Sequence, residues 1–301
     1  MSKLLRTAVL VLCCLICLCS CGEKKPEEKI SEGEDYVLHT DVSYGEHERH
    51  LVDICLPKGK TGYVGLVFFI HGGGWTAGDK DTFDGQLAGW AQQGYAAAAL
   101  NYRYADGQVT VFNMLDDITR CLGKVKALGA SYGMSIERTV IQGGSAGAHL
   151  ALMYAYTRAE VAPIRPVAVS SLSGPTDLCA PEYFAEGHKY RDPLDHMLSS
   201  VIGYDLDMSS PEAATPFLKQ SSPTSYAEDG VPTIICHGAH DDLIPLSNAY
   251  TLAEKLSEAK IPHELLIFPS SGHGLESDPD FSARSGELFQ QYVDKYLNGE
   301  E

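Results

Sequence analysis

Gly143-Gly144-Ser145-Ala146-Gly147 is the stretch that decides how the rest of this sequence is interpreted. It follows a β-branched run at 138–142 and precedes an Ala- and Leu-rich helical pattern at 146–156. A G-x-S-x-G sequence between a strand and a helix predicts a sharp turn, because the glycines let the backbone close tightly and push the serine hydroxyl outward. A serine hydroxyl is a weak nucleophile without a neighbouring base, so the motif alone fits a plain glycine-rich turn equally well.

Composition limits the kinds of partner that this chain can have. Its 301 residues suffice for one large α/β domain, and 44% of them are hydrophobic, which is ample for a core. The 40 acidic and 23 basic residues give a formal net charge of −17. This balance argues against binding to nucleic acid and against docking of the folded body on anionic lipid.

The first 20 residues have the pattern of a signal peptide. Lys3 and Arg6 precede an apolar run at 8–18 that is too short for a comfortable membrane span. Leu18-Cys19-Ser20-Cys21 resembles the lipobox of bacterial lipoproteins, and by that resemblance Cys21 becomes the lipid-modified first residue of the mature protein. The alternatives are a secreted protein cleaved nearby and an uncleaved anchor. We expect an exported lipoprotein of the bacterial cell envelope, on its periplasmic or outer-membrane face.

Residues 21–35 are charged and poor in apolar residues, which predicts a flexible tether. Residues 36–300 carry an α/β pattern, in which the alternating segments 36–44 and 49–56 indicate an antiparallel pair and the apolar run 64–70 a strand covered on both faces. Strands then alternate with helices, which predicts a mostly parallel central sheet of about eight strands with helices on both faces. The further strands are expected at 95–100, 139–142, 167–172, 233–236 and 264–268, and the helices at 83–93, 111–128, 146–156, 247–259 and 281–297.

A proline-rich stretch at 174–230 interrupts the alternation of strands and helices. A segment of this length inside a compact domain is usually functional, so we interpret it as a lid-like insertion with helical character near 192–202. Four cysteines lie outside the N-terminal segment, at positions 55, 121, 179 and 236. Export permits a disulfide, but the spacing assigns none and matches no metal site.

Three further motifs follow predicted strands, and the carboxyl ends of parallel strands meet at one edge of a sheet. The first is His71-Gly72-Gly73-Gly74-Trp75, after strand 64–70. Successive glycines let backbone N–H groups approach a substrate oxygen, so two N–H groups of this run, together with that of Ala146, are candidate oxyanion donors. A phosphate-binding loop is the alternative, but the run lacks both the Lys-Ser/Thr and the G-x-G-x-x-G spacing.

The other two motifs supply a carboxylate and an imidazole. Asp241 and Asp242 follow strand 233–236, and either could orient a histidine. His273 lies between two glycines after strand 264–268, where packing gives no reason for a histidine, so we predict that it is the base. His71 and His237 are expected to stabilise loops, His149 to pack, and His240 to lie too near the acid to act. The remaining six histidines, at 39, 47, 50, 188, 196 and 263, are assigned to surface or edge positions.

The order serine, acid, histidine is that of the α/β-hydrolase fold. Together the motifs resemble the esterase/lipase group with an HGGGW sequence, and within it the BD-FAE type, which is bifunctional acetyl/feruloyl esterase-like. Kynurenine formamidases and hormone-sensitive-lipase-like proteins have similar motifs. The resemblance runs from residue 36 to the C-terminus and also includes Asn101-Tyr102-Arg103 and Ser221-Ser222-Pro223.

The resemblance assigns roles to particular residues. It makes Asp241, the fifth residue of H-G-x-x-D, the acid, and it makes Gly73, Gly74 and Ala146 the oxyanion donors. It also implies that Trp75 shapes the substrate pocket, with ordinary packing as the alternative. Arg103 and Asp117 are expected to form a structural ion pair.

The sequence therefore predicts a serine carboxylesterase with the triad Ser145, Asp241 and His273. We expect it to act on short-acyl or aromatic-acyl esters, with acetyl and feruloyl groups on glycans as candidates, and to need no metal or organic cofactor. An arylformamidase-like amide hydrolase is the alternative within the same chemistry. A non-catalytic binding protein on a hydrolase scaffold is the alternative from another class. Nucleic acid is not an expected partner, and the membrane is expected only through the lipid at Cys21.

Overall fold

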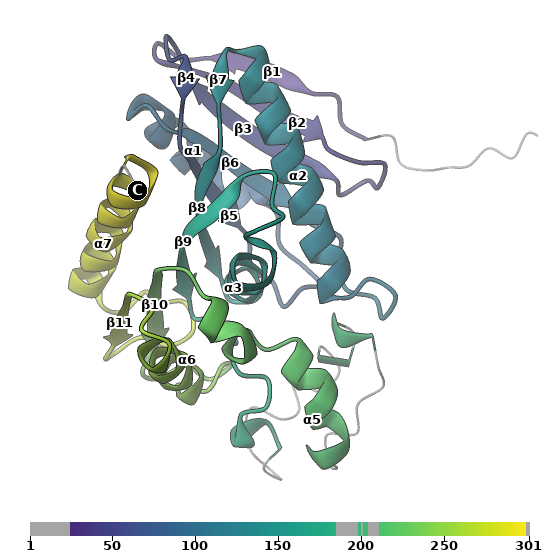
Figure 1. Cartoon of the computed structure of the whole chain (residues 1–301), viewed down its shortest axis with the longest axis vertical. Helices are drawn as coiled ribbons and strands as arrows, with labels where there is room; N and C mark the ends of the chain where they lie inside the picture. Colours follow the sequence, from purple (N-terminus) through teal and green to yellow (C-terminus); the bar gives the residue numbers. More distant parts are fainter. Residues whose placement is uncertain (1–24, 185–197, 200, 204–210, 299–301) are drawn as a thin grey trace, which may run out of the picture.

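A nine-stranded sheet forms the centre of the molecule in the computed structural model, which describes residues 25–184, 198–199, 201–203 and 211–298 (Figure 1). The strand order is β1-β2-β3-β6-β5-β8-β9-β10-β11. Their bounds are β1 Lys29–Glu32, β2 Tyr36–Ser43, β3 Leu51–Pro57, β5 Leu66–Ile70, β6 Ala96–Asn101, β8 Arg138–Gly144, β9 Arg165–Leu172, β10 Thr233–Gly238 and β11 His263–Phe268.

The sheet is antiparallel at one end and parallel elsewhere. Strands β1, β2 and β3 pair antiparallel, as does β3 with β6, whereas β6, β5, β8, β9, β10 and β11 all pair parallel. The chain runs from β5 to β6 on one side and then returns to β8 on the other, so the strand order reverses beside β5. Ligands of open α/β sheets bind beyond the carboxyl ends of the strands at such a reversal.

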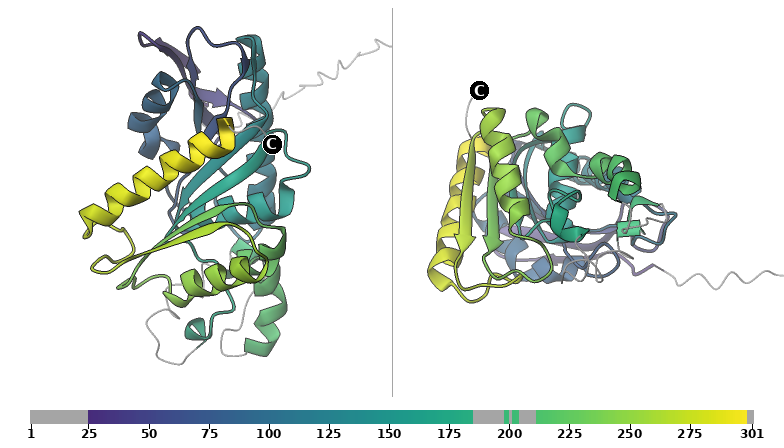
Figure 2. Two further views of the ribbon diagram at one scale, coloured as in Figure 1. Left: turned by 60° about the vertical axis from the view of Figure 1, so that its left-hand side comes forward. Right: turned by 90° about the horizontal axis from the view of Figure 1, so that it is seen from below.

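Helices cover both faces of the sheet, as expected. Alternate residues of β5 face opposite sides: Leu66, Phe68 and Ile70 belong to one core cluster, and Val67 and Phe69 to the other. Helices α1 (Asp84–Gln92) and α7 (Pro279–Asn298) pack on the second cluster, and α2 (Val111–Ser131), α3 (Ala146–Arg158) and α6 (Ser247–Glu258) on the first. Figure 2 shows α7 and α6 on opposite sides of the sheet.

Two small pairings were not predicted. Strand β1 lies within the segment expected to be a flexible tether, so the tether prediction is wrong over Lys29–Glu32, which pair with β2. All four residues are exposed, and an edge strand with one apolar residue has no hydrophobic pattern to reveal it. Strands β4 (Gly62–Tyr63) and β7 (Met134–Ser135) form a separate two-residue pair.

The described parts of the insertion lie beyond the carboxyl end of the sheet, below α3 in Figure 1. Its described parts include the 3₁₀ turn η2 (Pro181–Tyr183), helix α5 (Pro211–Gln220) and the 3₁₀ segment η3 (Pro223–Asp229). The helical segment predicted near 192–202 falls mostly outside the described residues, as do the signal peptide and Cys21. The cysteines at 55, 121, 179 and 236 are free thiols. Within the described ranges, no helix combines the length and apolar character that crossing a membrane requires.

Candidate active site

Ser145 occupies the turn between β8 and α3 in a backbone conformation that few non-glycine residues adopt. Its φ is 53° and its ψ is −122°. The neighbouring glycines are required by space, because a Cβ on Gly143 would lie 2.3 Å from the carbonyl oxygen of Gly147, and one on Gly147 would lie 2.2 Å from that of Ile70. The N–H of Ser145 donates to the carbonyl of Leu172 at 2.7 Å, which fixes the turn against β9.

The structure brings together the three side chains that the strand-end motifs carry. Ser145 Oγ lies 2.9 Å from His273 Nε2, and His273 Nδ1 lies 2.8 Å from Asp241 Oδ2. Asp241 has a buried side chain, whereas Asp242 is exposed, so geometry distinguishes the two carboxylates. The His273 side chain is 21% exposed, which leaves the imidazole accessible from solvent.

The carboxylate of Asp241 is held by several donors besides His273. Its Oδ1 accepts the backbone N–H groups of Leu243 and Ile244 at 2.8 and 2.9 Å, and His237 Nε2 lies 3.2 Å from Oδ2. Burial alone would raise the pKa of Asp241, but the hydrogen bonds from His237, His273 and Ile244 hold it well below its ordinary value. The acid is therefore ionised at neutral pH, where it can stabilise an imidazolium.

The glycine-rich loop after β5 lies directly against the serine turn. A Cβ on Gly72 would come within 3.3 Å of Ser145 Cβ and 2.9 Å of the carbonyl oxygen of Gly144. Gly73 and Gly74 have φ values of 101° and 57°, in the region that favours glycine. The backbone N–H groups of Gly73, Gly74 and Ala146 have no acceptor among the described residues, so they can donate hydrogen bonds to a substrate oxygen.

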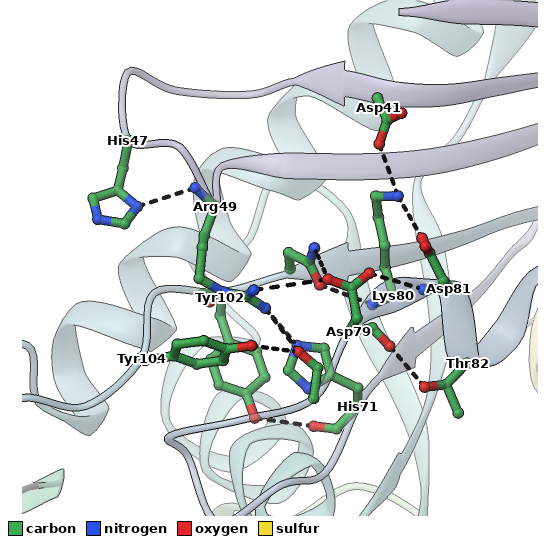
Figure 3. A network of polar contacts seen from close by, with 12 residues as sticks. Asp41, His47, Arg49, His71, Asp79, Lys80, Asp81, Thr82, Tyr102 and Tyr104 are labelled. Atoms are coloured by element: carbon green, nitrogen blue, oxygen red, sulfur yellow. Dashed lines mark hydrogen bonds and ion pairs between the residues drawn. The ribbon is translucent and has the colours of Figure 1, made fainter. Parts of the chain in front are cut away.

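A partly buried network of polar contacts supports this loop (Figure 3). Arg49 donates from Nη2 to His71 Nε2 at 3.3 Å and to the carbonyl of Gly78 at 3.1 Å, and its guanidinium lies 3.7 Å above the ring of Tyr104. Tyr102 stacks on His71, with ring centroids 4.3 Å apart, and donates its hydroxyl to the carbonyl of His71. Sequence reasoning gave His71 a loop-stabilising role but missed Arg49, for which no motif exists.

A buried cation, Lys80, holds the segment beside the loop. Lys80 is 4% exposed, and its Nζ lies 2.9 Å from Asp41 and 2.8 Å from Asp81 (Figure 3). The same Nζ lies 3.1 Å from Asp53. Burial raises the pKa of Asp53 to about 6, against the opposing attraction of Lys80. Lys80 is the first residue of the 3₁₀ turn η1 (Lys80–Phe83). The last two residues of this turn line the cavity described next, so the ion pairs of Lys80 fix one wall of the site.

A cavity of about 510 Å³ adjoins Ser145 and His273. Its apolar walls are Phe83, Leu172, Phe268 and Leu275, and small residues of α7 line another side, namely Ser282, Ser285 and Gly286. Trp75 is not among the lining residues, and its side chain is buried against His149 with 1% exposure. The prediction that Trp75 shapes this pocket is therefore not supported, and the packing alternative fits.

The other singled-out residues take structural positions. His149 is fully buried, as expected of a packing residue, whereas His39 and His50 were assigned to the surface or an edge and are 3% exposed each. His50 Nε2 lies 3.0 Å from Asp117 Oδ1, and Arg103 Nη2 lies 2.7 Å from the same oxygen, which confirms the predicted ion pair. His188 and His196 lie outside the described residues.

The fold and the site define an α/β-hydrolase. The serine lies on a strained turn, the acid and the base each follow a strand, and the strand order of the sheet reverses beside β5. The BD-FAE family model matches residues 52–256 of this chain, which therefore belongs to the BD-FAE family. The match includes the glycine-rich loop, the serine turn and Asp241, and it ends before His273.

Curated relatives agree with this assignment. The chain is 27% identical over 252 residues to the probable carboxylic ester hydrolase LipM of Mycobacterium tuberculosis (strain ATCC 25618 / H37Rv), covering 80% of this chain and 57% of that one. It is 26% identical to the isoprenylcysteine alpha-carbonyl methylesterase ICME of Arabidopsis thaliana, covering 77% and 55%. The chain thus spans little more than half the length of these relatives.

Solved structures support the fold. A truncated carbohydrate esterase from gut microbiota superposes with a TM-score of 0.66 at 19% identity, covering 90% of this chain and 99% of that one. The esterase Est2 of the Planctomycetes species Thermogutta terrifontis gives 0.64 at 22% identity, covering 90% and 92%.

Proposed function

We propose that this protein is a serine carboxylesterase. The observation that carries the proposal is the continuous hydrogen-bonded chain from Ser145 Oγ through His273 to Asp241, at 2.9 and 2.8 Å. A nucleophile, a base and an orienting acid at these separations are what activated-serine catalysis needs. The ester-hydrolase names of the relatives agree with this chemistry.

The geometry fits acyl transfer through an acyl-enzyme. His273 Nε2 accepts the hydroxyl proton while Ser145 Oγ attacks the ester carbonyl carbon, and the carbonyl oxygen becomes an oxyanion. The N–H groups of Gly73, Gly74 and Ala146 stabilise that oxyanion, and Asp241 stabilises the imidazolium. The carbon–oxygen bond to the alcohol then breaks, and the alcohol leaves with the proton held by His273. Water, deprotonated by the same imidazole, releases the acid and restores the serine.

The cavity beside the triad has room for an acetyl group and for larger acyl groups. Its volume of about 510 Å³ is in the range of pockets that hold small organic ligands. The four apolar walls suit an aromatic or short alkyl acyl chain better than a charged one. We therefore favour short-acyl and aromatic-acyl esters, with acetyl and feruloyl groups on glycans as the candidate natural substrates.

Location is a further proposal. The signal pattern of residues 1–20 and the lipobox ending at Cys21 favour a cell-envelope lipoprotein, where glycan esters are available. Metabolic labelling with a clickable fatty acid tests this, because label that persists in Cys21→Ala would exclude lipidation at this residue.

Hydrolysis of p-nitrophenyl acetate, p-nitrophenyl butyrate, methyl ferulate and N-formylkynurenine by the purified protein tests the proposed reaction. Ester hydrolysis is expected, and Ser145→Ala should lower kcat/KM by about a thousandfold or more. Ser257→Ala, which alters an exposed serine of α6, is the matched control and should leave activity unchanged. Faster turnover of the formamide than of every ester would favour the amidase alternative, and activity that survives in Ser145→Ala would exclude the triad. A fluorophosphonate probe that fails to label the wild type would favour a non-catalytic binding protein.

A further inference from the structure

His149 is a buried ionisable side chain that the proposed mechanism does not use. It lies on α3 one turn after Ser145, with its N–H donating to the carbonyl of Ser145 at 3.1 Å, and it is 0% exposed. A neutral imidazole buried among apolar side chains needs a partner for each nitrogen. His149 has both partners, and neither belongs to its own helix.

The two contacts of His149 fix its tautomer. Trp75 Nε1 can only donate, and it does so to His149 Nδ1 at 3.2 Å, so Nδ1 carries no proton. His149 Nε2 therefore bears the proton and donates it to the carbonyl of Ser221 at 2.7 Å. Burial lowers the pKa of His149 to about 4, which keeps this arrangement intact at neutral pH. The rings of Trp75 and His149 also meet edge to face, 5.2 Å apart.

These contacts join the two sides of the candidate oxyanion hole. Trp75 directly follows Gly73 and Gly74 and has a φ of 61°, an unusual value for a bulky residue that its surroundings must hold in place. His149 belongs to the same helix as Ala146, the third candidate donor. Ser221 follows α5 and begins the Ser221-Ser222-Pro223 sequence, which lies within the insertion.

We propose that His149 is a positioning residue: through Trp75 it fixes the glycine-rich loop relative to the helix behind Ser145, so that the N–H groups of Gly73, Gly74 and Ala146 converge on one oxygen. The contact with Ser221 ties the insertion to the same junction. This inference rests on the proposed esterase function, because it says which contacts hold the oxyanion donors of that reaction in place.

Two substitutions that remove the Trp75–His149 hydrogen bond test the proposal. Trp75→Phe deletes only the donor and keeps an aromatic ring, whereas His149→Phe deletes the acceptor and also the hydrogen bond to the Ser221 carbonyl. Each should lower kcat by between about tenfold and a hundredfold with little change in KM, because a displaced donor weakens transition-state binding more than substrate binding. The double variant should be no slower than the slower single variant, because both changes remove the same bond. Tyr154→Phe, which removes a buried hydroxyl elsewhere on α3, is the control and should keep wild-type kcat.

A spectroscopic readout keeps this inference separable from the proposed function. The chain has two tryptophans, so the indole N–H resonance of Trp75 can be assigned by comparison with Trp90→Phe. It should exchange slowly with solvent in the wild type and shift in His149→Phe. Absent esterase activity in the wild type would defeat the proposed function, whatever this resonance does. Full kcat in folded Trp75→Phe, or additive losses in the double variant, would overturn the role of His149. If His149→Phe fails to fold, Trp75→Phe alone decides.

Discussion

At the scale of single residues, two non-glycine residues of the site have strained backbone conformations. Ser145 has φ 53° and Trp75 has φ 61°, and non-glycine residues in such conformations cost about 1–3 kcal/mol each. Both are held by buried surroundings: Ser145 by its bond to Leu172, and Trp75 by its bond to His149. The strain is consistent with a serine hydroxyl that is exposed to substrate before any substrate binds.

The adjacent aspartates allow the acid to be tested against a neighbour of the same chemistry. Asp241→Asn should lower kcat by about 10⁴, as loss of the acid does in other serine triads, because an amide no longer holds His273 in the tautomer that accepts the serine proton. Asp242 is exposed, so Asp242→Asn should stay within about threefold of wild type. Steady-state kinetics on p-nitrophenyl acetate measures both. A larger loss in Asp242→Asn than in Asp241→Asn would reverse the assignment.

At the scale of elements, the acid and the base meet because two strands end in register. Gly238 at the end of β10 pairs with Phe268 at the end of β11, so the loops that carry Asp241 and His273 leave the sheet side by side. These loops touch closely, since a Cβ on Gly238 would lie 2.1 Å from the carbonyl oxygen of Gly272. No real side chain tolerates that distance, so glycine is required here by space.

Gly238→Ala should therefore separate the two loops. The backbone must shift, which lengthens the Asp241–His273 hydrogen bond, and kcat should fall at least about tenfold while the protein still folds. Gly89→Ala is the matched control, because a Cβ there meets nothing within 4 Å and glycine inside α1 costs about 0.5–1 kcal/mol relative to alanine. It should raise stability and leave kcat unchanged. Thermal unfolding and steady-state kinetics measure both effects in the two variants. A fully active Gly238→Ala would contradict the argument.

Elements with an apolar pattern could be predicted from the sequence, and contacts between distant segments could not. Strands β5, β9 and β11 were expected within three residues of their observed bounds, because each contains at least three consecutive apolar residues. The packing of Trp75 against His149 could not be predicted, because the two residues are 74 positions apart in the sequence. The burial of His50 likewise depends on Asp117, 67 residues away. Ser145 and His273 were identifiable because each follows a strand, and the choice of Asp241 over Asp242 needed the family resemblance.

At the scale of the whole molecule, two buried neutral histidines link the site to the pH dependence of folding. Burial lowers the pKa of His71 and of His149 to about 4 each, from an ordinary value of 6.5. As the pH falls below 6.5, the unfolded chain takes up these protons and the folded protein does not. The stabilisation is therefore present above pH 6.5 and is lost as the pH falls towards 4, on the order of 3 kcal/mol for each residue.

Such a loss is large beside a typical unfolding free energy of about 5–15 kcal/mol. We therefore expect urea denaturation to show a steep drop in stability between pH 7 and pH 4.5. His149→Phe removes one of the two titrating groups, so its stability should fall less over this range, by about 2.5 kcal/mol, even if it is less stable than the wild type at pH 7. Tyr154→Phe changes the same helix without removing a group that titrates here, and its drop should match the wild type. Equal drops in His149→Phe and wild type would mean that His149 is protonated in the folded state well above pH 4, which the donor at Trp75 Nε1 does not permit while that hydrogen bond persists.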